Sequence, residues 1–148
     1  MLAKEMKFIQ LVAIVIMSIF FAACDKSGLS DVVRNDYADI AEAKRDQLFE
    51  RGWLPDILPA STTQIVTKND LDLNLSSGEF TIDPKDFSKF QAQLKECVKS
   101  RDDVEELLNY AKKGYYPFCY TSNASTWKFY MNPTTGHCEY RMQTKKKS

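Results

Sequence analysis

The sequence is poor in several features that would point to a specific chemistry. It has one histidine and five glycines, and its 20 basic and 20 acidic residues cancel to a net charge of zero over 148 residues. A general nucleic-acid binder is usually basic, so this balance argues against one. The sequence contains no Cys-x-x-Cys pair, no Gly-x-Ser-x-Gly motif and no glycine-rich phosphate loop. Redox, serine-hydrolase and nucleotide chemistry therefore lack their usual sequence motifs.

Metal and cofactor motifs are equally scarce. The single histidine, His137, lies next to Cys138, and no second Cys or His pair completes a zinc site. A histidine in a surface turn is the simpler interpretation. We therefore expect no metal, no cofactor and no catalytic residue that the sequence alone identifies.

The N-terminus has the three parts of an export signal in order. Lys4 and Lys7 are followed by an apolar run over residues 8–23, which ends in two alanines directly before Cys24. The run is shorter than the roughly 20 residues that a membrane span needs. Phe21-Ala-Ala-Cys24 resembles the bacterial lipobox, in which the cysteine is acylated and the signal is cleaved just before it. An uncleaved anchor, or an ordinary signal peptide with a chance cysteine, are the alternatives.

This signal predicts a protein attached to a lipid bilayer through acylated Cys24 and facing the periplasm. Several acyl chains on one residue hold a protein stably, whereas one chain is marginal. Asp25 resembles the signal that retains lipoproteins in the inner membrane, but the choice between inner and outer membrane stays open. We expect a signal peptide at 1–23, a tether at 24–30, one domain at 31–143 and a basic tail at 144–148.

The domain is expected to be α+β, since 44% hydrophobic residues suffice for one packed core. Apolar spacing predicts helices over about 31–51, 84–99 and 100–114. Extended or alternating segments predict strands at 60–67, 71–75, 79–82, 115–120, 126–131 and 137–142. Together they predict a small antiparallel sheet of about five strands, packed on two or three helices.

Three cysteines remain if Cys24 is acylated, so at most one intramolecular disulfide forms. Cys119 and Cys138 are near in sequence, but the strand at 126–131 would lie between theirs. Strands two places apart are separated by about 9.5 Å, beyond the reach of a disulfide. The topology therefore disfavours that pair and leaves Cys97, which could reach either strand, as the partner of Cys119 or of Cys138. We favour Cys97 with Cys119, and three buried thiols are the alternative.

A contact surface is the remaining candidate site. Prolines at 55 and 59 prevent a helix over residues 53–59, and this loop carries several large apolar side chains. Such a loop either packs on the core or is presented to a partner, and some aromatic side chains of the C-terminal strands are also in excess of one buried face. The candidates for a binding surface are Trp53, Leu54, Ile57, Leu58, Tyr115 and Tyr130.

Short motifs resemble a known group of small bacterial lipoproteins, the YbbD-like head domain. They are Glu50-Arg-Gly-Trp-Leu-Pro55, Leu58-Pro-Ala-Ser61, Ile65, Asp70-Leu-Asp-Leu-Asn74 and Gly78-Glu-Phe80, with a late aromatic hairpin over 127–136. The resemblance implies an envelope protein and carries no catalytic residues.

We therefore expect a non-catalytic lipoprotein that binds an envelope protein or has a structural role. One alternative is an inhibitor or immunity lipoprotein that blocks an envelope enzyme or toxin. Another is a cell-wall hydrolase, which would need a cleft with two facing carboxylates. The mature chain is also polarised, because residues 25–110 hold 11 basic and 18 acidic side chains, whereas residues 111–148 hold 7 and 1.

Overall fold

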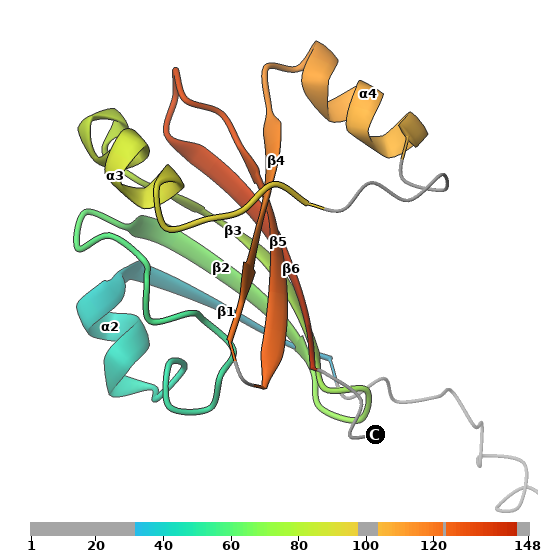
Figure 1. Cartoon of the computed structure of the whole chain (residues 1–148). Coiled ribbons are helices and arrows are strands. Elements are labelled where there is room, and N and C mark those ends of the chain that lie inside the picture. Colours follow the sequence, from blue (N-terminus) through green and yellow to red (C-terminus); the bar gives the residue numbers. More distant parts are fainter. Residues whose placement is uncertain (1–31, 98–103, 123, 145–148) are drawn as a thin grey trace, which may run out of the picture. The chain divides into compact units, whose positions relative to one another are not determined.

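The domain is built on one antiparallel sheet of six strands in the order β1-β2-β3-β6-β5-β4 (Figure 1). The computed structural model describes residues 32–97, 104–122 and 124–144, so the expected signal peptide, Cys24 and the tether lie outside the described residues. The strands are β1 (Val32–Asp39), β2 (Thr63–Asp70), β3 (Leu75–Thr81), β4 (Tyr116–Thr121), β5 (Ser125–Met131) and β6 (His137–Thr144). The helices are α2 (Ile40–Arg45), the 3-10 turn η1 (Pro84–Asp86), α3 (Phe87–Gln91) and α4 (Val104–Lys112).

One face of the sheet carries the hydrophobic core. Alternate residues of neighbouring strands point to this face, among them Ile65, Phe80 and Phe129, all fully buried. Phe90 of α3 lies against two of them, with ring centroids 6.5 Å from Phe80 and 5.6 Å from Phe129. Figure 1 shows α2 and α3 on this side of the sheet and α4 on the other. The expected α+β class is therefore present, with six strands instead of about five.

The expected helix over 31–51 is present only over Ile40–Arg45, and residues 46–51 form turns. Residues 32–39 form the edge strand β1, in which Tyr37 pairs with Ile65 of β2. The short helix α2 begins only after Asp39, whose side chain accepts a 2.9 Å hydrogen bond from the Glu42 N–H. The apolar spacing of this segment fits a helix, but pairing with β2 satisfies the backbone of β1 and places Tyr37 over the core.

A hairpin is present, but it begins earlier in the chain than the strands expected at 71–75 and 79–82. Its strands are β2 and β3, and residues 71–74, expected to lie in a strand, form the turn between them. The Asp70 carboxylate accepts a 2.9 Å hydrogen bond from the Leu73 N–H, and Asn74 has a left-handed backbone with φ 54°. These are turn features that Asp and Asn favour, and they override the Leu/polar alternation.

The expected helix over 84–99 is also much shorter. It ends at Gln91, and Lys95 then pairs with Cys119 of β4 through two backbone hydrogen bonds of 2.8 Å. Lys95 thus covers part of the otherwise open edge of the sheet. Helix α4 lies within the expected range 100–114. Residues 100–103 lie outside the described residues.

The three C-terminal strands lie where the sequence predicts them, with β5 between β4 and β6. A disulfide joins Cys97 to Cys119, the pairing that we favour from the sequence, with Cα atoms 5.0 Å apart. Cys138 is a free, fully buried thiol on β6. Strand β6 extends to Thr144, the first residue of the expected basic tail. Within the described residues, no helix has the length and hydrophobicity needed to cross a membrane.

Candidate functional site

The predicted contact surface over residues 53–59 belongs mostly to the core. Trp53, Leu54 and Leu58 are buried, and only Ile57 is partly exposed. The N–H groups of Trp53 and Leu54 both donate to the Leu48 carbonyl, at 2.9 and 3.2 Å, which folds the loop back over the end of the core. The prediction that this loop presents apolar side chains to a partner is therefore wrong, because covering the core removes the same surface from water.

Tyr130, the other predicted contact residue on the sheet, is also fully buried, but on the opposite face. It is covered by α4, whose Tyr110 stacks on it with ring centroids 3.8 Å apart and planes 12° apart. The Tyr110 hydroxyl donates a 2.5 Å hydrogen bond to the Glu139 carboxylate. Burial, and then this bond, raise the pKa of Tyr110 well above its usual range, so it is a neutral donor at physiological pH.

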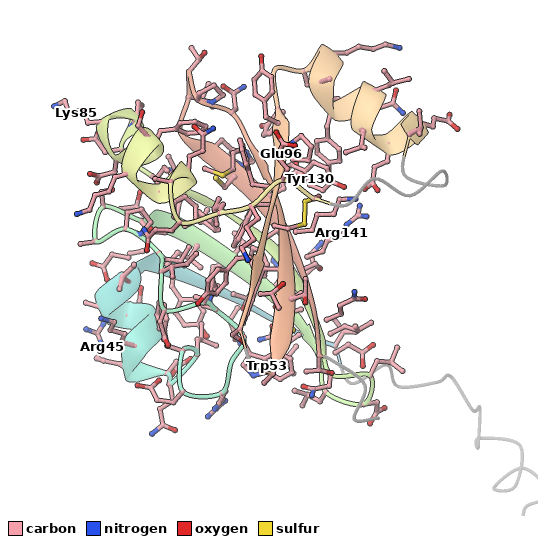
Figure 2. The ribbon with its side chains drawn as sticks, in the orientation of Figure 1. Arg45, Trp53, Lys85, Glu96, Tyr130 and Arg141 are labelled. Carbon is pink, nitrogen blue, oxygen red and sulfur yellow. A yellow bond between two sulfur atoms is a disulfide. The ribbon has the colours of Figure 1, made fainter. Side chains whose placement is uncertain are left out.

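Charged groups hold the preceding turn of α4 against the sheet. The Glu106 carboxylate forms an ion pair with the Arg141 guanidinium at 2.6 Å and lies 3.9 Å from the Lys128 ammonium. Lys128 also lies 5.3 Å from the centroid of the Tyr130 ring. Figure 2 shows Tyr130 and Arg141 on the side of the sheet that faces α4. These contacts fix α4 over β5 and β6, and no other helix of the described residues lies on this face.

A second group of interacting polar side chains lies where β6 begins. The Tyr115 hydroxyl, half-buried, lies 2.9 Å from Nδ1 of His137, and Nε2 of the same ring lies 3.6 Å from the Glu79 carboxylate. Burial raises the pKa of Tyr115. His137 is the first residue of β6, and its side chain has two partners, Tyr115 and Glu79. It is therefore not the isolated turn histidine that the sequence suggests. Sequence patterns do not indicate this group, because Glu79 and His137 meet through the pairing of β3 with β6, and Tyr115 comes from the segment just before β4.

The part of this face beside α4 contains two hollows. A hollow of about 250 Å³ has Arg34, Lys68, Ser77, Glu79, Glu139 and Arg141 in its lining. A second hollow of about 670 Å³ shares Lys68, Ser77 and Arg141 with the first and extends to Val32 and Leu75. We call the six residues Arg34, Lys68, Ser77, Glu79, Glu139 and Arg141 the polar face. The side chains of the polar face come from β1, β2, β3 and β6. No pattern within one segment of the sequence therefore predicts that they lie together.

The chemistry of the polar face suits binding more than reaction. Glu79 and Glu139 lie opposite each other in the β3–β6 register and so face one another on neighbouring strands. Each already has a protein partner, His137 and Tyr110 respectively, and the Glu79 side chain is 49% exposed. A general acid needs a carboxyl group in apolar surroundings, which a solvated carboxylate lacks. Among the described residues, no three His, Cys, Asp or Glu side chains gather as a metal site.

Comparison with known proteins gives one match. The family model of the YbbD head domain matches residues 31–81, which comprise β1, α2, the buried loop, β2 and β3. No curated protein and no solved structure matches the chain. The motifs between Glu50 and Phe80 lie inside the matched range, whereas the aromatic hairpin over 127–136 lies outside it. Over residues 31–81 the chain is therefore similar to the YbbD head domain, as its motifs indicate, and this match suggests an envelope-associated protein.

Proposed function

We propose that this chain is a lipoprotein of the bacterial cell envelope, anchored through acylated Cys24, whose domain binds a protein partner without catalysis. The order of the N-terminal signal supports the anchor: positive residues, an apolar run, small residues and then the cysteine. The match to the YbbD head domain supports an envelope location. Neither the signal nor the family match distinguishes the inner membrane from the outer membrane.

The observation that supports partner binding is the uncovered second face of the sheet. Helices α2 and α3 lie on the core side, and α4 is fixed over β5 and β6. The polar face therefore stays open to solvent over β1, β2 and β3, with cationic Arg34 and Lys68 beside anionic Glu79. Alternating charges of this kind give specificity and orientation to a protein contact more than they give raw affinity.

A site-specific photo-crosslinker tests this surface in living cells. With the crosslinking residue at Lys68, we expect one envelope protein to be captured in proportion to the amount of the chain. The same residue at Lys85 is the matched control, because Figure 2 places Lys85 beside α3, away from the polar face. Arg34→Glu, in the chain that carries the crosslinker at Lys68, should reduce capture about tenfold, because it replaces an attraction with a like-charge repulsion in the same contact.

The outcome at the two positions decides the proposal. Capture of the same proteins from Lys68 and Lys85, or capture from Lys68 that Arg34→Glu leaves unchanged, contradicts a contact through the polar face. The identity of the captured protein separates the two binding roles. A single enzyme or toxin in a stoichiometric complex favours an inhibitor or immunity protein, whereas a structural envelope protein favours a scaffold role.

A further inference from the structure

Exposed apolar side chains gather at one end of the sheet. Of the large hydrophobic residues that the structure shows exposed, five belong to the start of β1 and to the β2–β3 turn: Val32, Val33, Leu71, Leu73 and Leu75. We call these five residues the apolar tip. Leu73 is 65% exposed and is the most exposed of them. The other exposed hydrophobics, among them Leu108, lie on α4 and β4.

The strand register places Val32 and Leu75 in one row of the sheet, with Val33 in the next row. Val32 pairs with Asp70, Asp70 with Leu75, and Leu75 with Gln143 near the end of β6. The β2–β3 turn projects beyond this row, and Figure 1 shows it at the same end of the sheet as the start of β1 and the end of β6. The apolar tip is therefore one continuous feature, made by two segments that lie far apart in the sequence.

The turn holds its leucines in water by its own hydrogen bonding. The Asp70 carboxylate accepts from the Leu73 N–H at 2.9 Å, and Asn74 adopts a left-handed backbone. This conformation places Leu71 and Leu73 outside the core without any contact that buries them. Exposing leucine side chains to water costs free energy. Transfer of Leu71 and Leu73 to an apolar environment would therefore be favourable.

The position of the tip identifies that environment as a lipid surface. Val32 lies eight positions after Cys24, and eight residue steps span at most roughly 29 Å at about 3.6 Å each. An acylated Cys24 would therefore keep this end of the sheet near the bilayer. Lysines 145–147 directly follow Thr144 in the sequence, at the end of β6, and lysines near a membrane are attracted to anionic headgroups.

From these observations we propose that the apolar tip inserts into the headgroup region of the membrane that carries the anchor. Asp70 and Asp72, in and beside the turn, limit the depth, because carboxylates are not transferred into hydrocarbon. The tip thus orients the domain, with the sheet rising from the bilayer and the polar face open to the side. The position argument rests on the proposed anchor at Cys24, whereas the exposed leucines do not.

Quenching by brominated lipids tests the insertion. The full chain is made in cells and reconstituted into vesicles of phosphatidylethanolamine and phosphatidylglycerol with brominated acyl chains. Leu73→Trp reports on the tip, and Leu108→Trp is the control, since Leu108 is 56% exposed on α4. The native Trp53 and Trp127 are buried, and the unsubstituted chain gives their background. We expect quenching at Leu73→Trp to exceed that at Leu108→Trp by about threefold, as for groups 5–10 Å into the interface.

A second variant and a mass measurement make the outcomes separable. Adding Leu71→Asp to Leu73→Trp should abolish the excess quenching, while unchanged near-ultraviolet circular dichroism shows that the domain is folded. Equal quenching at both reporter positions in an acylated sample overturns the insertion and leaves the anchor standing. Excess quenching in a sample whose mass shows no acylation supports the insertion and refutes the anchor. A tip that self-associates in detergent without being quenched in vesicles also overturns the insertion.

Discussion

Replacing both cysteines of the Cys97–Cys119 disulfide with serine should destabilise the domain by about 3 kcal/mol. The bond closes a loop with a sequence separation of 22 residues. In the chain-entropy model, a loop of this length loses enough freedom in the unfolded state to stabilise the fold by about 3 kcal/mol. The closed loop contains α4, so the same bond limits how far α4 moves when Tyr110 and Tyr130 separate.

Urea unfolding followed by tryptophan fluorescence measures this effect, because Trp53 and Trp127 are both buried in the native fold. The serine variant should unfold at lower urea, and its slope should rise slightly, since an uncrosslinked chain exposes more surface when unfolded. Reducing the native chain should give the same midpoint as the variant. A midpoint that neither reduction nor substitution lowers by at least the equivalent of about 1 kcal/mol would refute the reasoning.

Four further predictions follow from the anchor, the core and the polar face. Cys24→Ser should abolish acyl-chain labelling in cells, and normal labelling of that variant would contradict the anchor. Trp53→Ala should cost about 3–5 kcal/mol in urea unfolding, the usual loss for a buried tryptophan, while leaving capture from Lys68 intact. Tyr110→Phe should cost about 1–2 kcal/mol at pH 7 through the lost bond to Glu139. Because the folded state raises the pKa of Tyr110, that difference should shrink as pH rises above about 10, where the unfolded tyrosine ionises. Purified chain should release no fragments from peptidoglycan; release that Glu79→Gln with Glu139→Gln abolishes would favour the hydrolase instead.

Sequence patterns predict the C-terminal half of the fold well because its strands carry their own markers. Trp127, Phe129 and Met131 alternate with polar residues, turn residues flank each run, and the three strands follow one another along the sheet. The same order of strands excludes Cys119 with Cys138, since β5 separates them. Here local pattern and neighbouring partner agree, so the sequence predicts the three strands and excludes one of the three disulfide pairings.

The N-terminal half is less predictable because long-range partners decide its conformation. Residues 32–39 carry a spacing that suits a helix, yet β2 supplies backbone partners and places Tyr37 opposite Ile65. The polar face has the same origin. Glu79 and Glu139 are 60 positions apart in the sequence and meet only because β3 pairs with β6. No periodicity within one segment encodes such a juxtaposition.

Two alternating runs show how the same pattern leads to different outcomes. Leu71, Leu73 and Leu75 alternate as regularly as Trp127, Phe129 and Met131, but Asp70 and Asn74 turn the backbone between the leucines. The aromatic run is buried under α3, whereas the leucines project from the end of the sheet. Alternation therefore indicates that every second side chain favours an apolar environment. It does not indicate which surface supplies that environment. For the aromatic run that surface is the core of this domain, and for the leucines the proposed surface is the membrane.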